Sequence, residues 1–340
     1  MKLLAVILAG GRGERFWPVS KAGFPKQFLS LFDKKPMIML TRQRLLGLVD
    51  RKDQYFVVPQ DLLATARRVL KGGRFIVEPT GRNTAAAIGL AAMSLERRWA
   101  DAVMCVLPSD HLIMDKPGFH RCLRFAARLA EQDYLVTFGI KPLRPETGYG
   151  YVKCRGRLET RGALVAYSVD VFKEKPDRAT AARYLRSGDY YWNSGIFVWK
   201  VSTIVDAIRR HAPKLYNGLR AYLKKRQSAL FARLPSISID HQVMEKARRI
   251  ALVRAAFDWD DVGSWDALAR HCRLSPQGNV VLGRAISIDT KNSIVFSENR
   301  LIAVVGLEDT IVVDGGDAIL VCKKGHTGRI REVVKQAGKT

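Results

Sequence analysis

The sequence predicts an α/β fold in which helices flank a mixed, mainly parallel sheet, with a small β-rich domain at the carboxyl end. Up to about residue 200, short β-branched runs alternate with helical stretches, and several runs are apolar at nearly every position. Alternation of this kind is typical of parallel strands joined by helices, and unbroken apolar runs are typical of strands covered on both faces. From about residue 279, short strands about eight residues apart indicate an all-β module.

The expected elements follow in chain order. Strand candidates in the first part are 3–9, 54–58, 74–77, 102–107, 134–140, 163–169 and 196–199. Helices are expected near 36–48, 61–70, 84–98, 118–132 and 177–187, and the last should end at the C-cap Gly188. Residues 201–247 are predicted to be mainly helical. Further strands are expected at 286–288, 293–296, 301–305, 310–313 and 318–322. The predicted domains are therefore 1–278 and 279–340.

The charge of the chain limits its partners. Lys and Arg number 57 against 32 Asp and Glu, which gives a net charge of +25. Such an excess fits nucleic acid, anionic lipid or phosphorylated small molecules. The basic residues divide evenly between the two halves of the chain and form no basic arm, so nucleic acid is disfavoured as a partner. No apolar run approaches the ~18 residues of a membrane span, so a membrane protein is not expected.

The sequence also bears on the compartment. The apolar residues 3–10 run straight into charged and bulky residues instead of a cleavage site, so we expect a buried strand there and no signal peptide. The five cysteines are odd in number and widely spaced, a pattern of neither a disulfide framework nor a zinc site. Both features indicate a cytoplasmic protein.

A glycine-rich loop, GGRGER (10–15), follows the first strand. Glycines let backbone amides approach an anion closely, as phosphate-binding loops require. The dinucleotide fingerprint would need a glycine where Phe16 stands, and the Gly-Lys-Ser/Thr of a Walker loop is absent. Arg15 and Lys26 could instead hold a polyphosphate at two points.

Eight motifs then occur in a fixed order. They are LAGGRGERFWPVS (8–20), FPKQF (24–28), VEPTGRNTAAAI (77–88), LPSDHLI (107–113), TGYGYV (147–152), FKEKPD (172–177), YYWNSGIFVWK (190–200) and FDWDDVGSW (257–265). In these motifs, and in a tail ending DAILVCKK (317–324), the chain resembles the sugar nucleotidyltransferases, specifically the mannose-1-phosphate guanylyltransferases. The resemblance covers essentially the whole chain. It departs at Lys21, where arginine is more usual, and at Ala86, where proline is expected.

The resemblance implies a Rossmann-like, GT-A-like nucleotidyltransferase fold with a short β-helix-like tail. It also implies a reaction in which GTP and mannose 1-phosphate give GDP-mannose and pyrophosphate, with Mg²⁺ as cofactor and the product feeding polysaccharide synthesis. Because both reactants are anions, catalysis would consist largely of charge neutralisation and alignment. Some relatives continue into a phosphomannose isomerase domain, for which this chain is expected to be too short.

The resemblance further implies which residues form the site. Arg15, Lys26 and Asp110 would be catalytic, and Asp110 and Asp261 would hold Mg²⁺, with Asp260 as the open alternative to Asp261. The nucleotide would contact Leu8, Ala9, Gly10, Gly11, Gly13, Arg82, Asn83, Thr84, Pro108 and Ser109. The sugar would contact Gly148, Tyr149, Glu174, Lys175, Asn193 and Gly195.

Other readings stay open at this point. Asn83 or Thr84 could simply cap the helix that follows, and Glu174 with Lys175 could be a solvated surface pair. The protein could use another sugar phosphate or nucleoside triphosphate, or could be a non-catalytic regulatory or nucleic-acid-binding protein on the same fold. The sequence does not give the oligomeric state, for which a homodimer is one option.

Overall fold

The computed structural model describes residues 2–338, which form two compact units. The first unit contains the residues up to Gly10 together with Arg42–Ser109 and Ile113–Trp259. The second contains Gly11–Thr41, Asp110–Leu112 and the residues from Asp260 onward. These units differ from the predicted division at 278 and 279, which stays a prediction. The glycine-rich loop and Asp110 are thus grouped with the carboxyl-terminal part of the chain.

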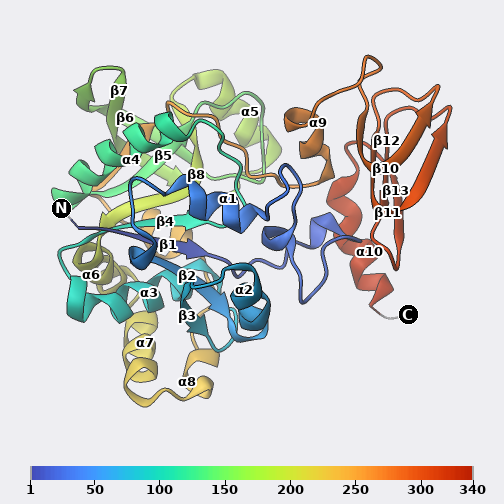
Figure 1. Cartoon of the computed structure of the whole chain (residues 1–340). Helices are drawn as coiled ribbons and strands as arrows, with labels where there is room; N and C mark the ends of the chain where they lie inside the picture. The colour runs from blue at the N-terminus through green and yellow to red at the C-terminus, as the bar shows by residue number, and fades with distance from the viewer. Residues whose placement is uncertain (1, 339–340) are drawn as a thin grey trace. The chain divides into compact units, whose positions relative to one another are not determined.

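A nine-stranded sheet forms the centre of the first unit within residues 2–338 (Figure 1). Its order is β3-β2-β1-β4-β8-β5-β9-β7-β6. The strands are β1 (Leu3–Leu8), β2 (Gln54–Pro59), β3 (Arg74–Glu78), β4 (Val103–Pro108), β5 (Leu135–Ile140), β6 (Tyr151–Arg161), β7 (Leu164–Lys173), β8 (Tyr190–Lys200) and β9 (Ile250–Arg254). Only β7 and β8 run against the other described strands, so the sheet is mixed and mainly parallel, which confirms the predicted fold class.

Helices cover both faces of this sheet. The helices that begin before residue 259 are α1 (Met37–Arg44), α2 (Leu63–Val69), α3 (Asn83–Trp99), α4 (Lys116–Glu131), α5 (Arg178–Ser187), α6 (Val201–His211), α7 (Pro213–Lys225) and α8 (Ser228–Ala232). The main core joins α3, α6 and α7 to one face of β1 through Leu4 and Val6, whereas Ala5 and Ile7, equally buried, point to the other face. Burial on both faces is the reason that this strand is apolar throughout.

Two strands, β6 and β9, were absent from the sequence-based prediction. Only Tyr151–Lys153 of β6 pairs with β8, and the rest of β6 forms a two-stranded ribbon with β7. This ribbon carries polar and charged residues at its exposed positions, so its sequence lacks the apolar pattern of the central strands. The predicted C-cap Gly188 is confirmed, because this residue ends α5 with a left-handed φ of 76°.

The second unit contains a smaller sheet of four described strands, in the order β10 (Val280–Ile288), β11 (Ile294–Val305), β12 (Thr310–Asp314) and β13 (Ile319–Lys323). The first three are parallel and stack Val280, Ile294 and Ile311 in register, as the successive turns of a β-helix do. The segment therefore forms the β-rich domain that the sequence predicts. A single bulged strand, β11, replaces the two strands expected at 293–296 and 301–305.

The end of the chain corrects one expectation. Only strands were expected in the β-rich domain 279–340, but α10 (Ile330–Ala337) follows the last strand. Ile330 is buried in a core that also contains Phe16, Trp265 and Phe296. The short helix α9 (Leu268–His271) lies in the same unit. Within residues 2–338, no helix is both long and apolar enough to span a membrane.

Candidate active site

The glycine-rich loop packs against the segment that carries Lys26. Gly13 has a φ of 62°, and a Cβ at this position would lie 2.5 Å from both the Cβ and the backbone nitrogen of Lys26. Only glycine fits there, because any side chain would meet backbone atoms that cannot move away. The Ser20 hydroxyl donates to the Gly13 carbonyl at 2.9 Å, and the Gln27 amide donates to the Gly11 carbonyl at 3.1 Å. These contacts fix the loop around Lys26.

Lys26 connects the two segments that carry the predicted metal ligands. Its ammonium donates to Asp110 Oδ2 at 2.9 Å and to the Asp261 carbonyl at 2.6 Å, and its side chain is only 6% exposed. Burial raises the pKa of Asp110, but the charges of Lys26 and His111 and the hydrogen bond from Lys26 outweigh this effect. The pKa of Asp110 therefore lies below its ordinary value, and the carboxylate is ionised at neutral pH.

The carboxylate of Asp260 is occupied by neighbouring protein groups. Oδ2 accepts a hydrogen bond from Arg270 Nε at 2.7 Å and lies 2.8 Å from His271 Nε2. Oδ1 accepts from Arg270 Nη2 at 2.9 Å and from the Val262 amide at 2.7 Å. Burial alone would raise the pKa of Asp260, but these hydrogen bonds and the charge of Arg270 hold it far below its ordinary value. Asp260 therefore stabilises the turn and has little capacity left for a metal ion.

Asp261 faces a different group. A Cβ built on Gly263 would lie 3.1 and 3.4 Å from the two Asp261 carboxylate oxygens and 3.4 Å from Arg15 Nη1. The Arg15 guanidinium and the Asp261 carboxylate therefore both lie beside Gly263. The segment that carries Asp110 is hydrogen-bonded to the segment that carries Asp261. Leu112 and Asp260 exchange backbone hydrogen bonds of 2.9 and 3.0 Å. The second unit thus brings together Arg15, Lys26, Asp110 and Asp261.

These residues fit a magnesium ion by the chemistry of their donors. In residues 2–338 there is no group of three or more His, Cys, Asp or Glu side chains arranged to hold a metal. Mg²⁺ does not require one, because it usually takes one or two protein carboxylates and completes its shell with water and phosphate oxygens. Asp110 is one-third exposed and ionised, and Asp261, whose backbone carbonyl accepts a hydrogen bond from Lys26, would supply the second carboxylate. Asp260, the alternative ligand, is occupied by Arg270 and His271.

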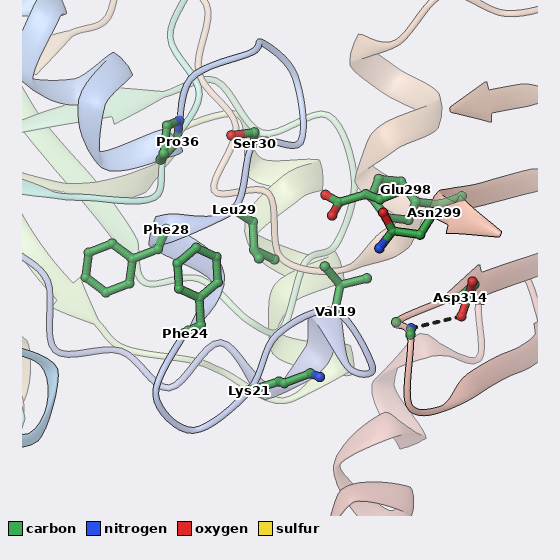
Figure 2. A pocket seen from close by; sticks show the side chains of 13 residues that line it. Val19, Lys21, Phe24, Phe28, Leu29, Ser30, Pro36, Glu298, Asn299 and Asp314 are labelled. Carbon is green, nitrogen blue, oxygen red and sulfur yellow. Dashed lines mark hydrogen bonds between the residues drawn. The ribbon is translucent and has the colours of Figure 1, made fainter. Parts of the chain in front are cut away.

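A separate cavity of about 450 Å³ lies in the same unit (Figure 2). Val19 and Leu29 line one wall, and Glu298 and Asn299 line the other. None of the site residues predicted from the sequence is among the described residues that line it. The predicted phosphate and metal contacts therefore do not belong to this cavity.

In the first unit, the ends of β1 and β4 carry the predicted backbone contacts to the nucleotide. The two strands are parallel and pair Leu8 with Pro108 at their carboxyl ends. The Ser109 amide donates to the Leu8 carbonyl at 3.0 Å, and the Ala9 amide donates to the Val57 carbonyl at 2.9 Å. Ligands of open α/β sheets bind at the carboxyl ends of the strands, so these residues lie at the edge where a nucleotide is expected.

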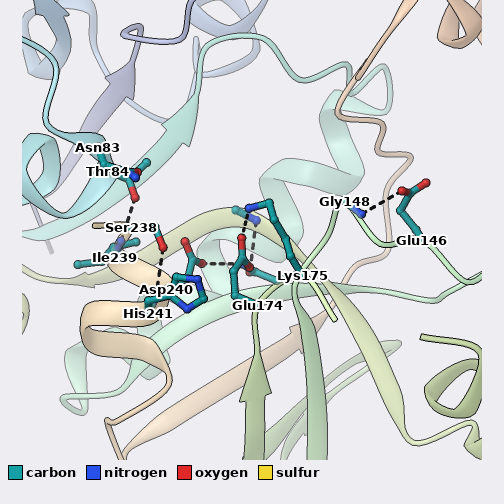
Figure 3. A network of polar contacts seen from close by, with 12 residues as sticks. Asn83, Thr84, Glu146, Gly148, Glu174, Lys175, Ser238, Ile239, Asp240 and His241 are labelled. Atoms are coloured by element: carbon teal, nitrogen blue, oxygen red, sulfur yellow. Dashed lines mark hydrogen bonds and ion pairs between the residues drawn. The ribbon is translucent and has the colours of Figure 1, made fainter. Parts of the chain in front are cut away.

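The start of α3 carries the residues predicted to contact the base. Asn83 has a left-handed φ of 64°, and its side-chain oxygen accepts a hydrogen bond from the Thr84 amide at 2.8 Å, which is a local helix-start contact. The Thr84 hydroxyl accepts from the Ile239 amide at 2.9 Å, a contact visible in Figure 3. Arg82 donates to the carbonyl of Ala232. Asn83 and Thr84 thus have structural contacts, and their nucleotide contacts stay predictions.

Glu78 is a residue of this edge that the sequence did not single out. It ends β3, is 3% exposed, and its Oε1 has no hydrogen-bond partner among the described residues. Its Oε2 lies 3.6 Å from the position that a Cβ on Gly10 would occupy. Burial raises the pKa of Glu78 to about 7. A carboxyl group at the end of an otherwise apolar strand, inside the VEPTGRNT motif, was the signal that could have identified it.

Among the residues predicted to contact the sugar, Asn193 already uses most of its side-chain amide in hydrogen bonds within the protein. Its Oδ1 accepts hydrogen bonds from the Thr137 hydroxyl at 2.8 Å and from the Gly195 amide at 3.3 Å. Its Nδ2 donates to Asp240 Oδ1 at 2.9 Å. A side-chain amide has two N–H groups, so Asn193 could offer one more to a ligand. The structure thus gives Asn193 a role in orienting Asp240.

Asp240 and Glu174 form a buried acidic pair (Figure 3). Asp240 lies in a π-helical turn (Asp240–Met244), and burial, followed by the charge of Glu174, raises its pKa to about 7. The Glu174 side chain is 7% exposed and pairs with Lys175, whose side chain is 60% exposed, so the carboxylate is buried and only the lysine faces solvent. A Cβ on Gly150 would lie 2.5 Å from Glu174 Oε2. No sequence pattern indicated Asp240, which is far from Glu174 along the chain.

Aromatic rings fix the loop that contains the other predicted sugar contacts. The Tyr149 ring packs edge-to-face against Trp192 and Trp259, with centroids 5.2 and 5.3 Å apart. The Gly148 amide donates to Glu146 at 3.1 Å. The base and sugar residues therefore belong to the first unit, whereas the phosphate and metal residues belong to the second.

Comparison with known proteins identifies the family. The Nucleotidyl transferase family matches residues 4–275, and the MannoseP isomerase/GMP-like beta-helix domain matches residues 283–337. A mannose-1-phosphate guanylyltransferase of Escherichia coli is 38% identical over 98% of this chain and 73% of its own length. The xanthan biosynthesis protein XanB of Xanthomonas campestris is 40% identical over 99% of this chain and 74% of its own length.

A solved structure agrees with this result. The Thermus thermophilus protein described as a mannose-1-phosphate geranyltransferase has a TM-score of 0.90 and 38% identity, covering 99% of this chain and 100% of its own. Fold and comparisons thus define the class as a nucleotidyl transferase followed by a β-helix domain, a class that generally uses a divalent metal. Within that class, the chain belongs to the family of mannose-1-phosphate guanylyltransferases, which confirms the resemblance found in its motifs.

Proposed function

We propose that this protein transfers GMP from GTP to α-D-mannose 1-phosphate, giving GDP-mannose and pyrophosphate, with Mg²⁺ as its cofactor. The observation that carries the proposal is the position of Lys26, which is buried against the glycine-rich loop and bonded to both predicted metal-binding segments. Lys26 contacts Asp110 and the backbone of Asp261, so it would lie close to both the phosphate groups and the metal ion. The curated relatives that carry the guanylyltransferase name support the choice of substrates.

The chain supplies the groups that the reaction needs. A phosphate oxygen of mannose 1-phosphate attacks the α-phosphorus of GTP, and the bond from that phosphorus to the bridging oxygen of pyrophosphate breaks. Both reactants are anionic, so the protein must neutralise charge and align the attack. Backbone amides of residues 10–13 hold the triphosphate, Lys26 binds phosphate oxygens at the reacting centre, and Arg15 stabilises the departing pyrophosphate. Mg²⁺ held by Asp110 and Asp261 would neutralise further phosphate charge.

In the proposed function, Glu78 is the residue that selects guanine over other bases. The Watson–Crick edge of guanine presents two adjacent donors, N1–H and the 2-amino group, which a carboxylate can accept together. Adenine presents an acceptor nitrogen at the matching position, and uracil and thymine present a single N–H between two carbonyl oxygens. A buried carboxylate left without its donors is unfavourable, so a wrong base would lose both binding and orientation. Glu174 and Lys175 would bind the hydroxyl and phosphate groups of the sugar.

The wider context of the proposal follows from the family. The partners are GTP, mannose 1-phosphate, GDP-mannose and pyrophosphate, and the names of relatives involved in xanthan and alginate biosynthesis support a role in polysaccharide synthesis. The cytoplasmic location and the homodimer stay predictions.

A substrate panel tests the proposed function. Pyrophosphate release should be measured with GTP, ATP, UTP and dTTP, each with mannose 1-phosphate and with glucose 1-phosphate. We expect GTP with mannose 1-phosphate to exceed every other pair in kcat/KM by about 100-fold or more. A preference for UTP or dTTP would contradict the guanylyl assignment. Salt-sensitive RNA binding without turnover would contradict the enzyme assignment altogether.

A further inference from the structure

A cavity of about 570 Å³ lies in the first unit, at the edge of the sheet where β5 and β9 begin. These two strands are parallel, so their carboxyl ends lie at the opposite edge, where Gly139 of β5 pairs with Asn193. Six residues of strand separate the two edges by about 20 Å. The cavity is therefore distinct from the predicted sugar contacts.

Basic side chains from two separate segments line this cavity. Arg210 and His211 end α6, and Lys246, Arg248 and Arg249 precede β9. Lys246 and Arg248 are exposed, and their side chains form no hydrogen bond or ion pair with any residue from 2 to 338. The position of Arg249 is fixed, because Nη2 donates to the Gln132 carbonyl at 2.7 Å and the guanidinium stacks over Tyr134 at 4.6 Å. The cavity thus presents three cations from one short segment.

The acidic residues of the lining are already paired with other groups. Asp206 contacts Arg209 at 2.8 Å and Arg210 at 3.3 Å. Asp133 contacts Lys200 at 2.5 Å and accepts a hydrogen bond from the Thr203 hydroxyl at 2.9 Å. Lys200 and Arg209 lie outside the cavity lining and offset the two acids without using Lys246 or Arg248, whereas the charge of Arg249 also acts on Asp133. The cavity therefore keeps an excess of positive charge.

The pKa of His211 responds to this excess of positive charge. Burial, and then the positive charges of Lys246 and Arg210, lower its pKa below the ordinary value. Basic residues at the end of a helix commonly offset the helix dipole, which accounts for Arg209 and Arg210 at the end of α6. Residues 246–249 belong to a different segment, and the dipole of α6 does not explain why three cations converge on the same cavity.

We propose that this cavity binds the phosphate group of a small phosphorylated molecule, at a site separate from the one where GTP and mannose 1-phosphate react. Its volume falls in the range of small-molecule sites and suits a nucleotide or a phosphorylated sugar. The cations converge on a hollow from two segments, whereas binding of a nucleic acid would require an extended basic stripe. The proposal does not depend on guanylyl transfer, and it gives part of the +25 charge a function.

The test uses His211 as a reporter inside the cavity. The full-length protein, labelled with ¹³C in its histidine rings and assigned with a His211→Gln variant, is titrated with inorganic phosphate by NMR. A parallel titration with sodium chloride at matched ionic strength measures screening alone. We expect a saturable shift of the His211 signals with phosphate only. In Lys246→Ala/Arg248→Ala, the affinity for phosphate should fall at least about tenfold.

A matched control and a third arm complete the experiment. Lys224→Ala/Lys225→Ala removes the same charge from the exposed end of α7, outside the cavity lining, and should leave phosphate affinity unchanged. Equal responses to phosphate and chloride, or unchanged affinity in Lys246→Ala/Arg248→Ala, would overturn the proposal. So would a single-stranded oligonucleotide that binds more tightly than phosphate and loses its binding in the same variant, because the face would then recognise a polymer. Turnover of the cavity variant without added phosphate should stay within about twofold of the parent protein.

Discussion

Four carboxylates of the candidate site differ between the two compact units of this protein. In the second unit, Asp110 contacts the ammonium of Lys26 and Asp260 contacts the guanidinium of Arg270, and both pKa values lie below the ordinary range. In the first unit, Glu78 and Asp240 are buried, and their pKa values are raised to about 7. Glu78 has an oxygen without a hydrogen-bond partner among the described residues, and the strongest charge acting on Asp240 is the like charge of Glu174.

The proposed function assigns the phosphates and the metal to residues of the second unit, and the base and the sugar to residues of the first. Phosphates and a divalent cation need side chains whose charges do not change near neutral pH, and direct ion pairs secure that. A base or a sugar is recognised by hydrogen bonds in a site with little water, where buried carboxyl groups give strong and directional acceptors. The loss of Lys26 or Asp261 from the second unit should therefore lower turnover strongly, whereas a change at Glu78 in the first unit should mainly alter selectivity and pH dependence.

The largest effect is expected from Lys26→Ala. The change removes the cation that joins Asp110 to the Asp261 backbone, so the reacting phosphates lose a positive charge in a buried position. We expect kcat to fall by about 10³-fold, as for the loss of a preorganised electrostatic contact. Pyrophosphate release with GTP and mannose 1-phosphate measures the effect.

Lys21→Ala is the matched control for this change. Lys21 belongs to the same loop but forms an exposed ion pair with Asp317, so activity should stay within about twofold. Circular dichroism and unfolding curves show whether each variant is folded. A folded Lys26→Ala protein with activity near that of the parent would remove Lys26 from the reaction.

The next effect separates the two neighbouring aspartates. Asp261→Asn should lower kcat by about 100-fold and raise the Mg²⁺ concentration needed for half-maximal rate, with little change in the free energy of unfolding. Asp260→Asn should instead lower the free energy of unfolding by roughly 3 kcal/mol, because Arg270 and His271 would lose a buried anionic partner. The opposite result, with Asp260→Asn stable but weak in Mg²⁺ activation, would exchange the two roles.

The same pair shows what sequence patterns can and cannot predict about the site. The ordered motifs identified Lys26, Asp110 and Asp261, and the structure brings their segments together. They left the choice between Asp260 and Asp261 open, because the partners of Asp260 are known only once the chain is folded. Asp240 was missed for a similar reason, since only the fold brings it beside Glu174.

The fold shows the same limit. The apolar strands β1 and β4 were predicted because burial on both faces leaves a continuous pattern in the sequence. Strand β6 was missed because most of it lies in an exposed ribbon, where polar residues interrupt that pattern. Helix α10 was missed because its eight residues follow a regular series of short strands. Hydrophobic periodicity thus predicts the centre of the sheet better than its margins.

Recognition of the base is expected to depend on Glu78. In Glu78→Gln, one acceptor oxygen becomes an amide donor, which would face one of the two guanine donors and repel it. We expect kcat/KM for GTP to fall by about 10- to 100-fold, and the preference for GTP over ITP, which lacks the 2-amino group, to disappear. Initial rates with both nucleotides measure this effect.

Glu131→Gln, at the exposed end of α4, is the matched control and should keep both rates. If Glu78→Gln kept the full preference for GTP over ITP, recognition of the guanine edge would have to come from other residues. The Lys26 and Asp261 variants, by contrast, should lower the rates with GTP and ITP to the same extent, because the two nucleotides have identical phosphates.

The last effect concerns stability and pH. The pKa of Glu78 in the folded chain, about 7, lies above its ordinary value of 4.5. Between these pH values the folded chain keeps a proton that the unfolded chain has lost, so Glu78 lowers the free energy of unfolding as the pH rises toward 7. In Glu78→Gln the free energy of unfolding does not fall in this way. Relative to the parent protein it should therefore rise by up to roughly 3 kcal/mol between pH 4.5 and pH 8. Urea unfolding of both proteins at several pH values measures the gain, and Asp240, present in both, cancels in the difference. A difference independent of pH would show that the pKa of Glu78 is the same in the folded and unfolded chains, and that the two units do not differ in the way proposed.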